Sequence, residues 1–361
     1  MSAGLRWRIR WRLSVLWALE WSITGAILTY LPLYFTERGL SINQLAELMA
    51  VSAVGLWVAP FVVGQLCDRW LATEKYLAIA HFIGGLTLFS IPTVTDTFQK
   101  TGEGFLALLF LVGLFAVVYF PTIPLASSMT FRHLTDPDSQ FGAVRIWGTL
   151  GWILAGLFLS LWLGRVEALA WLEANVSSAV STVQELREWT PLLPAPSSAD
   201  CFRIAALLSF ALSSFCVFLP ATPPARAEKG SVAPLQTLSM FRDRTFTLLI
   251  ATSFLLATVV PLYSLAVPQL LEQQLGFDRD WIPAVMTIGQ ISEFPALLLL
   301  PFFLQRFGLK ATFAIGMAAW FLRYAMFALN LPTALVFSAI ALHGVCHVFL
   351  IIVIQLYVDS Q

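Results

Sequence analysis

Apolar runs long enough to cross a lipid bilayer dominate the sequence. A transmembrane helix needs about 20 mostly apolar residues, and a hydropathy reading finds ten such runs. They cover approximately residues 12–35, 44–66, 76–94, 104–128, 142–164, 202–220, 246–271, 281–304, 311–329 and 332–358. With 58% hydrophobic and only 12% charged residues, the chain is more apolar than a soluble domain. The sequence therefore predicts an all-α polytopic membrane protein.

The first apolar run is predicted to stay in the protein as a membrane span. It follows the basic stretch MSAGLRWRIRWRLSVLW and continues to about Phe35 without a small-residue cleavage site. Most Lys and Arg residues of the predicted loops fall on the side that carries the N-terminus. Because cytoplasmic loops are enriched in positive charge, we expect the N-terminus to lie in the cytoplasm.

Composition and motifs argue against several functional classes. Lys plus Arg and Asp plus Glu both number 21, so no net charge favours nucleic acid. The four cysteines have no CxxC spacing, which disfavours a disulfide framework or a zinc site. GxSxG, HExxH, Walker A and glycine-rich dinucleotide motifs do not occur. We therefore expect no enzyme activity, no cofactor and no metal.

The pattern of apolar runs restarts after the sixth one. A polar linker, ATPPARAEKGSVAPLQTLSMFRDRT, separates it from runs seven to ten, which echo runs one to four. Two six-helix halves joined by a cytoplasmic linker define the major facilitator fold, whose substrate site lies near the bilayer midplane. We expect an N-terminal half at 1–220, a linker at 221–244 and an incomplete C-terminal half of four helices at 245–361. On this interpretation about ten of twelve transmembrane helices are present, as in a C-terminally truncated transporter.

Two polar residues interrupt the apolar run MTIGQISEFPALLLLPFF. Glu293 stands near its middle, and Gln290 lies one turn earlier on the same helix face. A charge at the bilayer centre costs roughly 2.5 to 3.5 kcal/mol, so such residues face a protein interior or a water-filled cavity. A carboxylate there can bind and release a proton, as a proton-coupled carrier requires. The alternative is a structural ion pair with Arg323 of the ninth run, and both interpretations can hold together.

Other polar residues lie within the predicted spans. Arg145 opens the fifth span in RIWGTLGW, with Thr149 one turn on and glycines that allow close helix approach. We expect Arg145 and Thr149 to bind substrate. The alternative for Arg145 is a side chain that extends to the cytoplasmic surface. His343 and His347 stand four residues apart in the tenth span, with Gln355 farther along. We expect the two histidines to bind substrate or pass protons, with a neutral buried histidine as the alternative.

Glu20 is the acidic residue of the first span, on the same helix face as Trp17 and Thr24. We expect Glu20 to face a cavity and to take part in proton coupling, with a locally satisfied interior carboxylate as the alternative. His81 of the third span is expected to be an interhelical histidine without a special function. The prolines of VVYFPTIPLASS predict a kinked fourth span.

The stretches FGAVRIWGTLGW, CDRWLATEKYLAIAHFIGGLTLF and TIGQISEFPALLLLPFFLQRFGLK resemble the nucleoside:proton symporters, the bacterial nucleoside permeases of the major facilitator superfamily. The resemblance implies a monomer in the bacterial inner membrane that imports a nucleoside with protons by alternating access, and it places Arg145 in the central cavity. GQLCDRW resembles the superfamily's loop between the second and third spans, which implies a gating role for Gly64, Asp68 and Arg69.

The sequence departs from the nucleoside permeases at two places. Val348 stands where a carboxylate is expected in the tenth span, and Pro261 and Ser264 stand where amide side chains are expected in the seventh. A weaker resemblance links the chain to oligosaccharide:proton symporters, which share an acidic residue in span eight, an arginine in span nine and a histidine in span ten. A sugar is therefore the alternative substrate, and a non-transporting membrane receptor is a further alternative.

Overall fold

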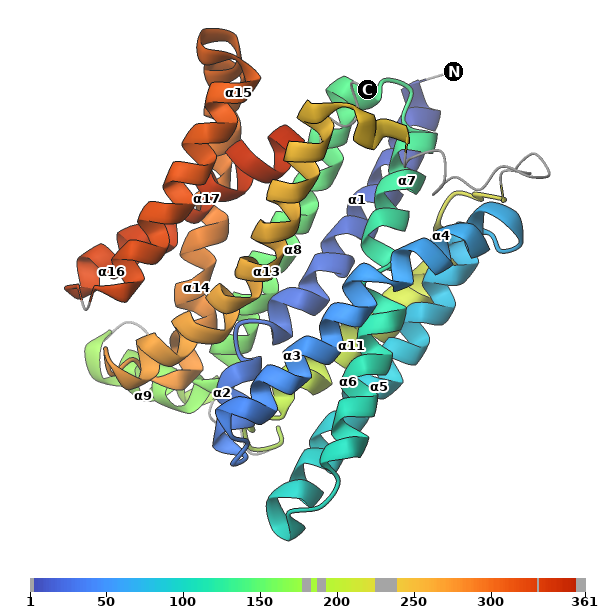
Figure 1. Ribbon diagram of the computed structural model, residues 1–361. Coiled ribbons are helices and arrows are strands. Elements are labelled where there is room, and N and C mark those ends of the chain that lie inside the picture. Colours follow the sequence, from blue (N-terminus) through green and yellow to red (C-terminus); the bar gives the residue numbers. More distant parts are fainter. Residues whose placement is uncertain (1–2, 177–182, 187–192, 225–238, 330, 355–361) are drawn as a thin grey trace. The chain divides into compact units, whose positions relative to one another are not determined.

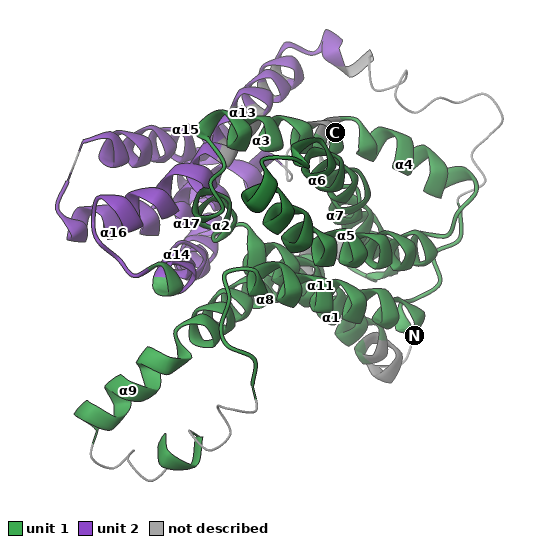
Figure 2. Cartoon of the chain, turned by 90° about the horizontal axis from the view of Figure 1, so that it is seen from below, with its two compact units in different colours: residues 1–238, 279–281 green, residues 239–278, 282–361 purple. Residues whose placement is uncertain are grey.

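The computed structural model describes residues 3–176, 183–186, 193–224, 239–329 and 331–354, and within these ranges its regular structure is helical (Figure 1). The chain forms two compact units (Figure 2). The first unit holds residues 1–238 and 279–281, and the second holds 239–278 and 282–361. The predicted linker at 221–244 lies mostly outside the described residues.

The helices of the first unit follow the predicted spans one to six. They are α1 (Ala3–Ile27), α2 (Leu31–Glu37), α3 (Ile42–Trp57), α4 (Ala59–Arg69), α5 (Thr73–Thr101), α6 (Phe105–Tyr119), α7 (Thr122–His133), α8 (Pro137–Leu163), α9 (Arg165–Asn175) and α11 (Asp200–Phe215), with the 3₁₀ turns η3 (Cys216–Phe218) and η5 (Arg279–Trp281).

Three predicted spans of this unit are each divided into two helices at a proline. Pro32 and Pro60 lie in the first turn of α2 and of α4, and Pro121 separates α6 from α7. Proline has no backbone N–H and its ring collides with the preceding turn, so a helix rarely continues through it. The kink predicted in the fourth span is thus confirmed as a break between two helices.

Glycines set the close contact between α1 and α8, which lie side by side (Figure 1). A Cβ atom added to Gly25 would lie 2.7 Å from the carbonyl oxygen of Trp152, and one added to Gly151 would collide with the backbone of Ala18. Only glycine lets the two backbones approach this closely. Helix α1 also packs against α11, so it lies in the interior of the first unit.

The second unit contains η4 (Ser239–Arg242), α13 (Arg244–Gln273), α14 (Ile282–Ile291), α15 (Glu293–Ala328), α16 (Thr333–Ala341), α17 (His343–Cys346) and the π-helix η6 (His347–Ile352). Helix α15 covers parts of two predicted spans. Between them Gly308 interrupts the helical backbone with φ 75°. That left-handed conformation is readily adopted by glycine, and Gly308 belongs to the predicted turn LQRFGLK.

Seven helical stretches in the described part of the chain are long and apolar enough to cross a membrane. They are Ile9–Glu37, Thr73–Thr101, Phe105–His133, Gln140–Leu163, Asp200–Phe218, Arg279–Ala328 and Thr333–Ile352. The stretch Arg279–Ala328 contains two of the predicted spans. The remaining predicted spans, 44–66 and 246–271, are helical as well.

Candidate transport site

Glu293 is placed by a short break between two helices. Helix α14 ends at Ile291 and α15 begins at Glu293, with Ser292 between them. The Ser292 hydroxyl oxygen accepts a hydrogen bond from the backbone N–H of Gly344 at 2.8 Å. A Cβ atom on Gly344 would collide with the Ser292 backbone. The glycine therefore lets the start of α15, with its carboxylate, pack directly against α17.

Gly344→Ala is expected to push Ser292 and Glu293 away from α17, and so to lower both stability and uptake. Overpacking of this kind typically costs about 1 to 3 kcal/mol. The measurement is the melting temperature of the purified variant together with its initial uptake rate. Gly142→Ala is the matched control, because a Cβ added there meets nothing within 4 Å. Equal behaviour of the two variants would contradict the close contact.

Two imidazoles face the Glu293 carboxylate. Its Oε1 lies 3.4 Å from Nε2 of His343 and 3.7 Å from Nδ1 of His347. Only 7% of Glu293 is exposed, whereas the two histidine side chains are 15% and 23% exposed. The structure thus brings together three of the residues that the sequence selected, at a site where a proton can pass between a carboxylate and an imidazole.

Arg323 is fully buried next to this group, and its partner differs from the prediction. Its Nη1 lies 3.1 Å from Nδ1 of His343, its Nε donates to the Ala339 carbonyl oxygen at 3.1 Å, and its Cζ lies 3.7 Å from the centre of the Tyr263 ring. The sequence suggested a direct ion pair between Arg323 and Glu293. Within the described residues, His343 instead connects the two, because it contacts both the guanidinium and the carboxylate.

Gln290 and Arg323 of the second unit each have a buried polar atom without a hydrogen-bond partner among the described residues. The atom is Oε1 in Gln290, a residue that is 7% exposed, and Nη2 in Arg323. A buried polar group without a partner costs about 1 to 3 kcal/mol. One atom accepts and the other donates, so a polar ligand or an ordered water could satisfy both kinds of group. Gln355, predicted to lie along this stripe, is outside the described residues.

In the first unit, Arg145 lies against two tryptophans of α1. Its Cζ is 4.8 Å from the ring centre of Trp17 and 4.5 Å from that of Trp21. A Cβ on Gly148 would come within 2.8 Å of Nη1 of Arg145, so the glycine leaves room for the guanidinium. Cation–π contacts hold the charge between α8 and α1. Thr149, one turn on, is buried.

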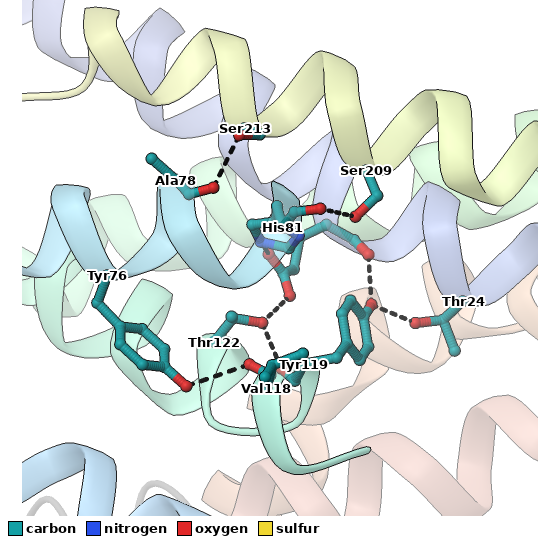
Figure 3. Close-up of polar contacts among 10 residues, drawn as sticks. Thr24, Tyr76, Ala78, His81, Val118, Tyr119, Thr122, Ser209 and Ser213 are labelled. Atoms are coloured by element: carbon teal, nitrogen blue, oxygen red, sulfur yellow. Dashed lines mark hydrogen bonds and ion pairs between the residues drawn. The ribbon is translucent and has the colours of Figure 1, made fainter. Parts of the chain in front are cut away.

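Glu20 is closed off from the solvent, contrary to the predicted cavity position. It is 0% exposed, and its Oε2 lies 2.9 Å from Nε2 of His81, which is also 0% exposed. The Thr122 hydroxyl donates to Oε1 of Glu20, and the Tyr119 hydroxyl donates to the Glu20 carbonyl oxygen at 2.7 Å. Figure 3 shows His81, Tyr119 and Thr122 converging at this point. The locally satisfied carboxylate, which was the alternative, is what the structure contains.

The predicted gate residues lie at the C-terminal end of α4. Asp68 and Arg69 are exposed, and Gly64 is partly exposed. A Cβ added to Gly64 would meet nothing within 4 Å, so helix packing in this structure does not require the glycine. The gating role remains a prediction.

The fold is that of the major facilitator superfamily. A solved structure of the proton:xylose symporter XylE, a member of that superfamily, matches with a TM-score of 0.57, 11% identity and coverage of 98% of this chain and 81% of that one. A crystal structure of a mutant of the nucleoside transporter NupG matches with a TM-score of 0.76, 24% identity and coverage of 98% and 83%. Both matches show that the chain has the major facilitator fold.

The model of the nucleoside H⁺ symporter family matches residues 7–361, and the chain belongs to that family. It is 31% identical to the putative nucleoside transporter YegT of Escherichia coli strain K12, over 97% of this chain and 76% of YegT. It is 28% identical to the nucleoside permease NupG of the same strain, over 90% of this chain and 72% of NupG. The family resemblance inferred from the sequence motifs is confirmed.

Proposed function

We propose that the protein imports nucleosides together with protons by alternating access. The observation that carries the proposal is Glu293, a buried carboxylate that faces two imidazoles inside an otherwise apolar stretch. Ionisable groups within membrane spans are costly and mark proton or substrate pathways. Membership of the nucleoside H⁺ symporter family supports the same function.

In this proposal the two units contribute different groups. Glu293 binds the transported proton, and His343, Arg323 and His347 surround it. In the second unit, Gln290 and His347 offer hydrogen bonds to the substrate. In the first unit, Arg145 and Thr149 are the proposed substrate-binding residues. Protonation of Glu293 neutralises a buried charge, which lowers the cost of closing the loaded site away from water. We expect a monomer in the bacterial inner membrane with its N-terminus in the cytoplasm.

Uptake of labelled uridine by cells that express the protein tests this function. Uptake is expected to exceed that of cells with an empty vector, and to fall when a protonophore collapses the proton gradient. Uptake that does not fall when the protonophore is added would contradict proton coupling. The absence of uptake for all nucleosides would contradict the substrate class.

A sugar is the second candidate substrate. The structure joins an acidic residue, an arginine and a histidine into one cluster, namely Glu293, Arg323 and His343. These are the three features that the sequence shares with oligosaccharide:proton symporters. Parallel uptake of labelled lactose separates the candidates, because only a carrier that accepts a disaccharide accumulates it.

A further inference from the structure

His343 is held between a permanent cation and a carboxylate. Its Nδ1 lies 3.1 Å from Nη1 of Arg323, and its Nε2 lies 3.4 Å from Oε1 of Glu293. The ring of Tyr263 stacks on it at 6.0 Å with an interplanar angle of 14°, and the ring of His347 stacks at 5.6 Å and 22°. The imidazole thus has little freedom to turn.

The guanidinium determines which nitrogen of His343 carries the proton. Arginine donates hydrogen bonds, accepts none and stays charged in proteins. The imidazole nitrogen that faces Arg323 must therefore present a lone pair. A neutral imidazole with its lone pair on Nδ1 carries its proton on Nε2. That N–H is directed at the Glu293 carboxylate.

A second proton on His343 would disrupt this arrangement. It would replace the lone pair on Nδ1 with an N–H, break the hydrogen bond from Arg323 and place two positive groups 3.1 Å apart. Helix α14 packs closely against the histidine: a Cβ added to Gly289 would lie 3.2 Å from the His343 Cβ.

We propose that His343 is a positioning residue, an inference that rests on the proposed function. Arg323 keeps the imidazole of His343 neutral, so the transported proton binds Glu293 and not His343. The proton adds to a Glu293 carboxylate oxygen and leaves from it, and His343 keeps its single proton throughout. Within the described residues, the titratable and charged groups that contact His343 are Glu293 and Arg323 of α15, His347 of η6 and Tyr263 of α13. Cys346 stands three residues further along α17.

The same geometry indicates a different role for the second histidine, His347. His347 contacts the same carboxylate oxygen at 3.7 Å, stands outside the contact with Arg323 and is more exposed than His343. It is therefore the imidazole of this pair that exchanges protons between Glu293 and water.

Nitrogen NMR of the protein labelled with ¹⁵N-histidine tests the proposal without any substrate. The chain has four histidines, so His343→Asn assigns the His343 signals by their disappearance. We expect two inequivalent ring nitrogens, one of them protonated, across about pH 5 to 8, the range in which a free histidine titrates. In Arg323→Met we expect the same ring to titrate. Conversion of His343 to imidazolium in the wild type within this range would overturn the proposal.

A transport comparison provides the second test. Asparagine at 343 offers an oxygen to Arg323 and an N–H to Glu293, whereas phenylalanine offers neither. His343→Asn is expected to retain uptake driven by a pH gradient, and His343→Phe to lose it. If His343→Asn exchanges substrate but has lost driven uptake, His343 carries the proton and the proposal is wrong. Failure of the wild type to transport uridine or lactose would reject the proposed function instead, while the NMR result still decides the state of His343.

Discussion

Glu293→Gln is expected to abolish uptake driven by a pH gradient and to leave measurable exchange of substrate across the membrane. The amide keeps the size and shape of the carboxylate but cannot take up a proton. The measurement uses proteoliposomes: driven uptake under an imposed pH gradient, and counterflow with substrate on both sides and no gradient. Counterflow reports substrate binding and conformational change, whereas driven uptake also needs the proton.

The matched control is Glu47→Gln, which makes the same chemical change at an exposed position of α3. It is expected to behave as the wild type in both assays. Driven uptake that persists in Glu293→Gln would show that another group couples the proton, and His347 would then be the next residue to test.

The second large effect is expected at the buried pair of the first unit. Glu20→Ala leaves His81 without its carboxylate partner in an interior that water does not reach, whereas the Thr122 hydroxyl keeps the Tyr119 carbonyl oxygen as an acceptor. Breaking a buried pair by removing one member costs about 3 to 5 kcal/mol. We therefore expect a large drop in the melting temperature of the purified variant, and a similar drop for His81→Ala.

The double variant Glu20→Ala with His81→Ala is the decisive comparison. Its loss of stability is expected to be clearly smaller than the sum of the two single losses, because no unpaired ionisable group remains. Strict additivity would mean that the two side chains do not interact. Glu20→Gln separates structure from transport: if Glu20 carries a transported proton, this variant loses driven uptake as Glu293→Gln does.

The positions of the helices along the chain were largely predictable, because hydropathy and proline act locally. A run of about 20 apolar residues can only be accommodated as a membrane helix, and each predicted span corresponds to helical structure. Pro121 indicated where the fourth span breaks. Glu293 was also predictable as a candidate site residue, because an acidic group in an apolar run is conspicuous whatever its partners are.

The partners themselves could not be predicted from periodicity. Thr122 and Glu20 are 102 positions apart in the chain, and the contact between them depends on how helices pack. His343 was expected to take part in proton coupling, and nothing local indicated that Arg323 would bind it. The contact of Tyr263 with Arg323 was not predicted, because aromatic residues make up 14% of the sequence and one of them does not stand out. One signal was available: a buried carboxylate needs a partner, and His81 is the only histidine predicted within a span of the first half.

The burial of the Glu20–His81 pair in the first unit determines whether these two residues contribute to a transport current. Glu20 and His81 are both 0% exposed, so they exchange no protons with water while the first unit keeps this structure. They are therefore silent in a current recording. When one proton crosses with an uncharged nucleoside, one elementary charge moves, and the membrane potential contributes about 2.3 kcal/mol per 100 mV. In the proposed symport, the voltage dependence of transport thus reports on the second unit, where the proposed proton carrier Glu293 lies.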